Sequence, residues 1–383
     1  MSRRVLLLST SLGMGGADRQ ILYLAEALLS HGYDVRVVSM TPLGEMGQQA
    51  VSRGLPVSSL DMERGRADWS SFRRFVSILR SWKPDVLTSF MYHANLLGRV
   101  AGRWAGVPLI VTSIRSERHG GAARDWLMRL TRWMDDCCTT NSRQVADSLQ
   151  ARGMFPARKS CVIPNGVDTT SVGISPEERQ RLRHELGAAP NDFLWVAVGR
   201  LLPQKDYPTL LRAFALLPQA TSALAIAGRG PLLSDLEQMS YEQGTAERVK
   251  FLGVRDDVPA LLIAADGFVL SSAWEGMPNV VMEALTAAKP VVATRVGGLP
   301  ELVEDGKTGL LVPSGEPTAL AKAMIRVMSM PPNERTQMGM LGRHHVVSRY
   351  GLQFMADQWI SLFGELLSTR GLPGSPTGQP VRP

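Results

Sequence analysis

The sequence predicts an α/β protein made of two Rossmann-like, doubly wound domains. Short apolar segments alternate with longer amphipathic ones along the chain, which is typical of strands joined by helices. Many short segments are apolar at nearly every position, as parallel strands covered by helices on both faces must be. With 383 residues, 44% of them hydrophobic and 20% charged, the chain is long enough for two domains with separate cores.

The predicted strands fall into two groups. Those of the first half are RVLLLST, DVRVVSM, LPVSSL, PDVLTSF, PLIVTSI, DDCCTTN and SCVIPNG. Those of the second half are FLWVAVG, ALAIAG, RVKFLG, GFVLSS, PVVAT and GLLV. Ligands of open α/β sheets bind at the carboxyl ends of the strands. Two such sheets facing each other across a cleft would therefore place the functional residues in the loops that follow the strands.

The domain boundary is expected near residues 170–175. A helix is predicted directly after it, because Ser175 is a suitable N-cap, Pro176 suits the first helical position and Gly187 is a stop signal. We expect an N-terminal domain at 1–172, a C-terminal domain at 173–348, an amphipathic helix at 350–367 and a disordered Pro- and Gly-rich tail at 370–383.

Charge is divided unevenly along the chain. Residues 1–170 contain 22 Lys and Arg against 14 Asp and Glu, which suits nucleic acid, anionic lipid or a phosphorylated substrate. An arginine-rich surface without any such partner is the alternative. The three cysteines lack both a disulfide framework and zinc spacing, so the reducing cytoplasm is the expected compartment. No apolar run reaches the roughly 18 residues of a membrane span. Val5–Leu8 is too short for a signal peptide and is predicted to be a buried strand.

A glycine-rich loop, SLGMGGADRQ, follows the first strand and opens a helix. Gly15 and Gly16 would offer bare N–H groups and the positive helix end to an anion. Gly13-x-Gly15 begins the dinucleotide fingerprint, but Asp18 stands in the place of the third glycine and no acid closes the second strand. A nicotinamide site is therefore disfavoured. A pyrophosphate or an acceptor near Gly15 and Gly16 is the preferred interpretation, and a plain tight turn is the alternative.

Two cations follow the first strand of the second half. Arg200 ends that strand and Lys205 comes five residues later, which suits a diphosphate because one cation can form a fork and the other is a point charge. Taken alone, the two are equally well explained as solvated loop charges. The turn at Gly253 and Val254, after a later strand, has backbone groups that can meet a base edge.

The stretch SSAWEGMPNVVMEAL places Glu275 at the end of a strand and Glu283 in the next helix. Pro278 disfavours the helical region at Met277, and Asn279 is expected to be the N-cap of a helix over 280–287. The N–H groups of 276–280 would then point at the ligand of Glu275. Carboxylates repel an anion, so the two glutamates should hold neutral hydroxyls at both ends of a diphosphate, as in a nucleotide sugar. An isolated Glu pair at this spacing more often has a structural explanation; sharing a cleft with the two cations favours binding.

These motifs closely resemble family 4 of the retaining glycosyltransferases, which have the GT-B fold. The resemblance rests on R-x4-K, on EGMPNVVME, on KPVVATRVGGLPELVEDGKTGLLV (289–312), and on GMGG, SFMYHANLLGR and PNGVD, and it spans all but the tail. It implies an N-terminal acceptor domain, onto which the last helix packs back, and a C-terminal nucleotide-sugar domain. The donor-binding residues that it implies are Gly16, Arg200, Lys205, Val254, Glu275, Gly276, Met277, Pro278, Asn279, Val280 and Glu283.

The resemblance also implies a mechanism. Arg200 and Lys205 would bind the diphosphate, Glu275 the transferred sugar and Glu283 the ribose. His93 would lie near the sugar and the acceptor, although a lone histidine there is often structural. The chain contains no Asp-x-Asp, so we expect no metal and no cofactor. Front-face attack is expected, with the leaving phosphate taking the acceptor's proton, because both glutamates are assigned to the donor. Arg229 departs from the acid that many members carry in this turn.

Acceptor specificity is expected in the N-terminal half. Gly15, Gly16 and His93 are candidate acceptor residues, as is Arg115 in the basic loop 113–125, where Arg118 and Arg124 are further cations for a lipid-linked pyrophosphate. The helix predicted at 69–83 has an apolar stripe with arginines beside it, which fits a membrane-surface helix or a packed surface helix equally well. We expect a cytoplasmic enzyme with peripheral contact to anionic membrane on the inner face of the plasma membrane, and no nucleic-acid partner.

Three other functions compete with this one. A nucleotide-sugar epimerase can share the double-Rossmann layout and would act without an acceptor. A non-catalytic sugar- or nucleotide-binding protein would carry a degenerate site, which the intact set of Arg200, Lys205, Glu275 and Glu283 argues against. A dehydrogenase is disfavoured by the missing acid after the second strand.

Overall fold

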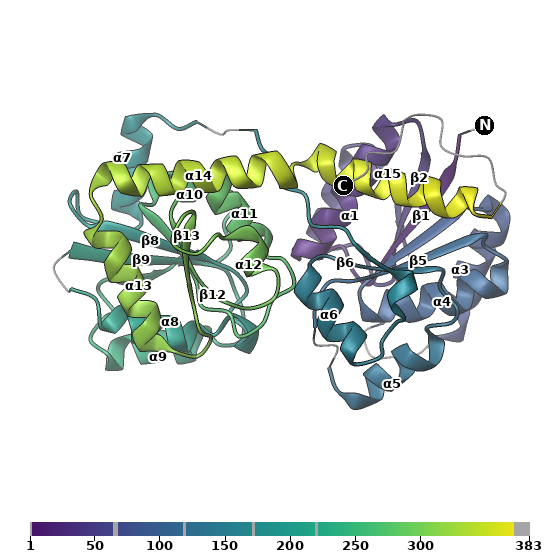
Figure 1. The fold of residues 1–383 in the computed structure, drawn as a ribbon, viewed down its shortest axis with the longest axis horizontal. Helices are drawn as coiled ribbons and strands as arrows, with labels where there is room; N and C mark the ends of the chain where they lie inside the picture. The colour runs from purple at the N-terminus through teal and green to yellow at the C-terminus, as the bar shows by residue number, and fades with distance from the viewer. Residues whose placement is uncertain (1, 64–67, 118–119, 171–172, 219–220, 371–383) are drawn as a thin grey trace. The chain divides into compact units, whose positions relative to one another are not determined.

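The computed structural model describes residues 2–63, 68–117, 120–170, 173–218 and 221–370. The chain divides into two compact units (Figure 1): unit 1 is Met1–Gly166 with Leu352–Pro383, and unit 2 is Val167–Gly351. The chain thus passes from unit 1 to unit 2 between residues 166 and 167. The boundary predicted between 172 and 173 adjoins residues 171–172, which lie outside the described ranges, as does the predicted tail beyond residue 370.

Unit 1 contains a parallel sheet of seven strands in the order β3-β2-β1-β4-β5-β6-β7. The strands are β1 Arg4–Ser9, β2 Asp34–Ser39, β3 Val57–Ser59, β4 Val86–Phe90, β5 Leu109–Ile114, β6 Cys137–Thr140 and β7 Ser160–Val162. The helices are α1 Gly16–Ser30, α2 Glu45–Ser52, α3 Trp69–Trp82, α4 Tyr92–Ala105, α5 Ala122–Thr131, α6 Arg143–Ala151 and α15 Leu352–Ser368, with a 3₁₀ turn η1 at Ala157–Lys159.

Unit 2 contains a second parallel sheet, of six strands in the order β10-β9-β8-β11-β12-β13. The strands are β8 Phe193–Val198, β9 Ser222–Ala227, β10 Val249–Phe251, β11 Gly267–Leu270, β12 Val291–Thr294 and β13 Gly309–Val312. The helices are α7 Pro176–Glu185, α8 Tyr207–Ala215, α9 Leu233–Glu242, α10 Val258–Ala264, α11 Asn279–Thr286, α12 Leu299–Leu302, α13 Pro317–Ser329 and α14 Pro332–Tyr350, with a 3₁₀ turn η2 at Pro203–Lys205. Every segment predicted to be a strand forms one, and the α/β class is confirmed.

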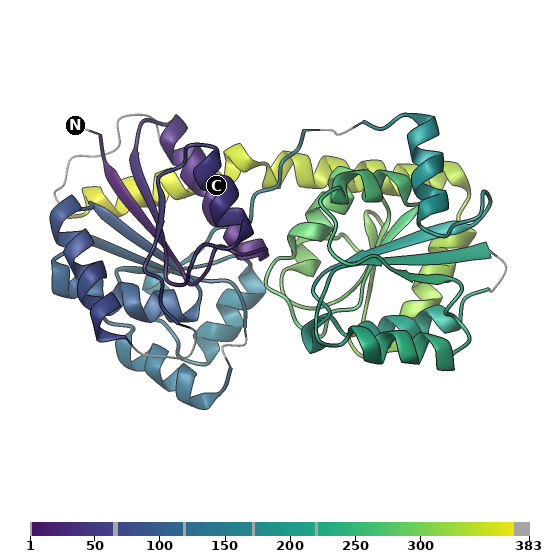
Figure 2. The same ribbon diagram turned by 180° about the vertical axis from the view of Figure 1, so that it is seen from behind.

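Both faces of the unit 1 sheet are covered, which explains its unbroken apolar strands. Val5 and Leu7 of β1 belong to a core shared with α1 and α15, whereas Leu6 and Leu8 belong to a second core with α3 and α4. Figures 1 and 2 show the sheet between these two helical layers. Side chains alternate between the faces of a strand, so only apolar residues at successive positions can serve both cores.

Two helices test the boundaries expected from the sequence. In α7 the Ser175 side chain accepts a bond from the N–H of Glu178 at 3.1 Å, which confirms the predicted cap. The helix predicted at 350–367 instead begins at Leu352, because Tyr350 ends α14 and Gly351 separates the two helices. It packs on α1 in unit 1 through a face that includes Trp359.

The apolar stripe of α3 faces the protein core. Phe75, Val76, Leu79 and Trp82 are all buried in the cluster beneath α3 and α4. Of the two interpretations of this helix, the packed surface helix is therefore the one that the structure supports.

Candidate active site

Three candidate donor residues of unit 2, and also Arg229, follow neighbouring strands of the sheet. In the order β10-β9-β8-β11, the carboxyl ends lead to Val254, Arg229, Arg200 and Glu275 respectively. Neighbouring parallel strands end at one edge of the sheet, so these residues share that edge.

Lys205 and Glu275 form an ion pair at this edge. Lys205 ends the short turn η2 after β8, Glu275 follows β11, and the Nζ and Oε1 atoms lie 2.5 Å apart. Ser272 donates a second hydrogen bond to Oε1 at 2.7 Å. Glu275 is only 5% exposed, so its carboxylate is held by charge and hydrogen bonding in a poorly solvated place.

Gln204 joins the same two loops and was not foreseen from the sequence. Its Nε2 donates to the carbonyl of Trp274 at 3.1 Å and lies 3.4 Å from Glu275 Oε2. The main-chain carbonyl of Gln204 accepts a hydrogen bond from the N–H of Ala273 at 2.8 Å. The loop after β8 is therefore tied to the loop after β11 by backbone and side chain together, which fixes Lys205 and Glu275 before any ligand arrives. An uncharged glutamine beside a lysine gives no sequence signal for such a role.

The glycines of VGGLP support Glu275 from beneath. Gly297 has φ 52°, and a Cβ there would lie 2.2 Å from the carbonyl oxygen of Glu275. The next residue, Gly298, donates its N–H to the carbonyl of Gly276 at 2.5 Å. The loop after β12 can approach the 275–276 backbone this closely only because Gly297 has no side chain.

The helix after Glu275 begins one residue earlier than expected. Pro278 is the extended N-cap residue, and Asn279 is the first residue of α11, so the prediction that Asn279 caps the helix is wrong. Proline fits the position since its missing N–H would have no helical partner there. The amides of Asn279 and Val280 thus lie in the first turn, with Glu283 half-buried in the second.

Arg200 is exposed and lies against the turn after β9. The N–H of Leu201 donates to the carbonyl of Arg229 at 3.0 Å, and a Cβ at Gly228 would lie 1.9 Å from the carbonyl oxygen of Gly199. The two turns are packed backbone to backbone, which brings the exposed residue Arg229 beside Arg200. Two exposed arginines therefore follow the neighbouring strands β8 and β9.

In unit 1 the glycine loop is closed by an acidic side chain. Asp18 Oδ2 accepts from the N–H of Gly13 at 3.0 Å and from that of Gly15 at 3.1 Å, and Asp18 is 7% exposed. The expectation that Gly15 offers a bare N–H group to an anion is therefore wrong, because Asp18 already uses it. Gly16 begins α1 directly beside this carboxylate. The roles of Gly15 and Gly16 in acceptor binding stay predictions.

His93 lies in the first turn of α4, after β4. Burial lowers the pKa of His93, and the positive charge of Arg124 lowers it further, so the ring is neutral at pH 7. Met91, just before the helix, has φ 74° and ψ 163°, a region that is essentially restricted to glycine. Its N–H is bonded to the carbonyl of Ser113 at 3.1 Å. Backbone strain of this kind is concentrated at functional sites, which supports a role for this turn.

Arg115 follows β5 and has an unusual environment. Its guanidinium lies over the rings of Phe90 (5.1 Å) and Trp359 (6.0 Å) and donates to Asn165 Oδ1 at 2.8 Å. Its buried Nε has no hydrogen-bond partner, and among the described residues no carboxylate pairs with it. Burial lowers the pKa of Arg115 to about 9, which leaves it charged at neutral pH. Arg118 of the same loop lies outside the described residues.

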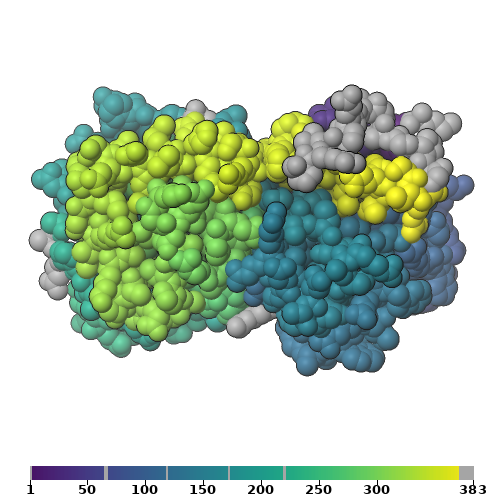
Figure 3. Space-filling view, in the orientation of Figure 1, coloured from purple at the N-terminus to yellow at the C-terminus, as the bar shows by residue number. Residues whose placement is uncertain are grey.

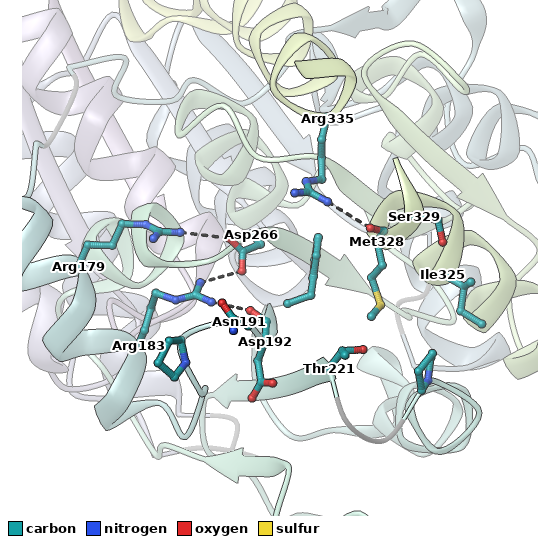
Figure 4. Close-up of a pocket in the computed structure, with 13 residues that line it drawn as sticks. Arg179, Arg183, Asn191, Asp192, Thr221, Asp266, Ile325, Met328, Ser329 and Arg335 are labelled. Atoms are coloured by element: carbon teal, nitrogen blue, oxygen red, sulfur yellow. Dashed lines mark hydrogen bonds and ion pairs between the residues drawn. The ribbon is translucent and has the colours of Figure 1, made fainter. Parts of the chain in front are cut away.

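A pocket of about 460 Å³ lies elsewhere in unit 2, at the amino ends of the strands (Figure 4). Asp266, just before β11, accepts from Arg183 at 2.7 Å and from Arg179 at 3.1 Å. Arg183 also donates to the carbonyl of Asp192 at 2.6 Å. These cations hold α7 against the sheet, so a structural role explains the pocket.

No helix among the described residues is long and apolar enough to cross a membrane. Within the same residues, no group of three or more His, Cys, Asp or Glu side chains is placed to hold a metal ion.

Comparison with known proteins gives matches over both units. The family described as "Glycosyl transferases group 1" matches residues 178–345, and the one described as "Glycosyl transferase 4-like domain" matches residues 15–166. The chain is 29% identical over 275 residues to the UDP-Gal:alpha-D-GlcNAc-diphosphoundecaprenol alpha-1,3-galactosyltransferase of Escherichia coli, covering 68% of this chain and 70% of that protein.

A second relative is the GDP-mannose-dependent alpha-(1-6)-phosphatidylinositol monomannoside mannosyltransferase of Mycolicibacterium smegmatis. It is 33% identical over 270 residues, which cover 67% of this chain and 69% of that protein. Among solved structures, Anabaena Alr3699/HepE in complex with UDP-glucose superposes with a TM-score of 0.83 at 24% identity, over 96% of this chain and 99% of that one. This likeness shows a shared fold.

Proposed function

Because the chain belongs to the family of group 1 glycosyl transferases, we propose that it moves a hexose or N-acetylhexosamine from a UDP-sugar to a glycan or lipid-linked acceptor, with retention at the anomeric carbon. The chain is a glycosyltransferase of the GT-B fold, related to enzymes of bacterial glycan and lipid assembly. The epimerase and the non-catalytic binding protein are therefore the less favoured alternatives.

The arrangement at one sheet edge of unit 2 supports the donor site. Arg200 and the first turn of α11 supply positive charge there, and Glu275, held by Lys205, supplies a fixed acceptor for hydroxyl groups. Glu283 in the second turn of α11 is the proposed partner of the ribose diol. This succession of charges along neighbouring strand ends is the observation that carries the proposal.

The donor base is proposed to be uracil. The Escherichia coli relative uses UDP-Gal and the Anabaena structure contains UDP-glucose, whereas the mycobacterial relative uses GDP-mannose. The EGMPN turn resembles that of family members that use UDP-sugars. The turn at Gly253, which accepts from the N–H of Gly228 at 2.7 Å, leads to Val254, the proposed contact of the base.

The state of Glu275 supports front-face attack. Oε1 is bonded to Lys205 and Ser272, and Gln204 lies beside Oε2. These contacts make the carboxylate a poor nucleophile for the anomeric carbon. It still has lone pairs that can accept a sugar hydroxyl. In the proposed step the anomeric C–O bond to the leaving diphosphate breaks, the acceptor oxygen bonds to the same face, and its proton passes to the departing phosphate.

Metal-independent transfer is proposed because protein charges can stabilise the departing diphosphate. Arg200 and the amino end of α11 act where negative charge grows as the bond breaks. His93, neutral at pH 7, is proposed to lie near the sugar and the acceptor. We propose no organic cofactor, since the nucleotide sugar is itself a substrate.

The proposed acceptor carries a phosphate group and a lipid. Both relatives named above act on lipid-linked acceptors, one on a diphosphoundecaprenol and the other on a phosphatidylinositol mannoside. Arg115, which lacks a carboxylate partner among the described residues, is the proposed contact of an acceptor anion. Peripheral contact with an anionic membrane is proposed with it.

Product analysis tests the proposal. The protein is incubated with UDP-, GDP- and ADP-sugars, with and without a polyprenyl-diphosphate-linked sugar, in buffer with and without EDTA. We expect an acceptor-dependent product whose new bond has the anomeric configuration of the donor, formed also in EDTA. Isomerised donor without acceptor would show an epimerase, binding without turnover a non-catalytic protein, and an inverted linkage would contradict the mechanism.

A further inference from the structure

Helix α5 exposes side chains that a helix of a globular protein ordinarily buries. Met128 is its one buried residue. Trp126, Leu127 and Leu130 are 59%, 38% and 53% exposed, and Trp133, two residues beyond the helix, is 66% exposed. The segment lies at the surface of unit 1 in the view of Figure 3, where it is blue. Large apolar side chains gathered on one outer surface mark a binding surface rather than a core.

The charges around these residues are positive. Arg129 and Arg132 are exposed and alternate with the apolar residues along the segment. The acid of the helix, Asp125, is paired with Arg152, so it does not offset them. Tryptophan and leucine interleaved with arginine are typical of helices that lie in the plane of a membrane interface, where long cationic side chains reach the headgroups.

The exposed aromatic side chains of α3 and α4 differ from those of α5. Trp69 stacks on Phe72 at 4.9 Å, and Phe72 meets Trp104 edge-on at 6.1 Å, so these rings pack against one another. The remaining apolar residues of α3 face the core. The stripe that suggested a membrane helix in the sequence is thus used internally, and α5 is the stronger candidate.

The position of α5 connects this surface to the acceptor residues. The guanidinium of Arg124, in its first turn, lies 5.1 Å from the centre of the Tyr92 ring, and that ring meets His93 edge-on at 5.0 Å. The amino ends of α4 and α5 are therefore neighbours at the edge of the sheet that carries His93. A membrane in contact with α5 would lie beside the residues proposed to receive a lipid-linked acceptor.

We propose that Trp126, Leu127, Leu130 and Trp133, with Arg129 and Arg132, form the surface by which unit 1 docks on an anionic membrane leaflet. The biological role of this surface rests on the proposed function, because a lipid-linked acceptor lies in such a leaflet. Insertion of the rings between headgroups supplies affinity, and the arginines supply the preference for negative lipid.

Sedimentation with vesicles tests the surface, using the full chain without substrates. Vesicles of phosphatidylglycerol and phosphatidylcholine are compared with phosphatidylcholine alone, at low and high salt. The double variant W126A/W133A should bind anionic vesicles about tenfold more weakly or worse. R129Q should lose about fivefold on anionic vesicles and show a weaker dependence on salt. W104A, equally exposed at 59%, is the matched control and should bind like the wild type.

Three outcomes would overturn the proposal. The first is a wild-type protein that does not bind anionic vesicles. The second is a W104A variant that loses as much binding as W126A/W133A. The third is a wild-type dimer that becomes a monomer in the double variant, while vesicles have no effect. The last would show a second copy as the occupant. Transfer to a detergent-soluble acceptor is measured in parallel and should be unchanged in W126A/W133A. Vesicle binding without any transfer would contradict the proposed function and leave the docking surface standing.

Discussion

Lys205 Nζ and Glu275 Oε1 lie 2.5 Å apart, and their side chains are only 14% and 7% exposed. The sequence had suggested that the lysine meets the donor diphosphate and the glutamate its sugar. In the structure the two charges already compensate each other. The diphosphate charge would therefore fall mainly to Arg200 and the amino end of α11, while Lys205 holds the carboxylate in place.

The first prediction concerns this pair. Removing one member, as in K205M, leaves the other charge buried without its counter-charge, so we expect the free energy of unfolding to fall by about 3–5 kcal/mol. Turnover should fall as well, because Glu275 loses its position. The double variant K205M/E275Q should recover much of the stability but not the activity. Denaturant unfolding of K205M, E275Q and the double variant measures this coupling, and additive losses would show that the pair is not a stabilising unit.

Substitution of Arg200, unlike that of Lys205, should lower activity without lowering stability. It is exposed, so R200A should change the free energy of unfolding by less than about 0.5 kcal/mol. The loss of a charge aimed at the leaving group should lower kcat/KM about 10²–10³-fold. R200K should recover only part of it, because an ammonium group cannot form the bidentate fork of a guanidinium. Steady-state kinetics with varied donor are the measurement, and full activity in R200A would remove Arg200 from the site.

Gly297 tests whether the shape of the loop beneath Glu275 matters. G297A places a Cβ 2.2 Å from the Glu275 carbonyl oxygen at a positive φ, so the 275–276 turn must shift. We expect about 2–4 kcal/mol of destabilisation and a lower turnover. G306A is the control, since Gly306 has φ 79° but open space around it, and it should cost roughly 1 kcal/mol without affecting turnover. Equal effects of the two substitutions would leave only backbone strain as the explanation.

The sequence predicted the strands well because their signal is local. Apolar runs bounded by turn residues mark each β-strand, and Ser175, Pro176 and Gly187 mark the ends of α7 with side chains that act within one turn. The start of α11 was misplaced by one residue because proline and asparagine both suit a helix entry, and tertiary contacts decide between them.

The parts of the site that were missed depend on contacts between distant loops. Gln204 reaches Glu275 from the loop after β8, and Gly297 supports it from the loop after β12. Ser272 bonds Glu275 from within the same loop, three residues earlier. The closure of the glycine loop by Asp18 could have been suspected, since an acid three residues after an N-cap glycine often bonds back to free amides. Residue type alone does not reveal which neighbours meet in space.

His93 is predicted to affect turnover more than donor affinity. H93A should lower kcat by about 10²-fold, because the ring proposed to position the sugar and the acceptor is lost, with the donor KM little changed. Burial lowers the pKa of His93 below its ordinary value of 6.5, so the neutral ring persists from alkaline pH down through neutrality. The wild-type rate should therefore stay level through pH 7 and decline only below 6.5, as the ring gains a proton. H184A, at an exposed position on α7, should leave this profile unchanged.

Substitution of Arg115 should weaken acceptor binding without destabilising the fold. Its charge lies over Phe90 and Trp359 and has no carboxylate partner among the described residues, so R115M should be neutral or slightly stabilising. The acceptor KM should nevertheless rise about 10–100-fold, because a charged hydrogen bond to the acceptor anion is lost. Arg99 is the matched control: it is fully buried with Asp135 at 2.5 Å, so R99M should lose about 3–5 kcal/mol of stability without a selective effect on the acceptor. If R115M instead unfolds as readily as R99M, Arg115 is a structural residue, because its loss would then act through the fold and not through a contact with the acceptor.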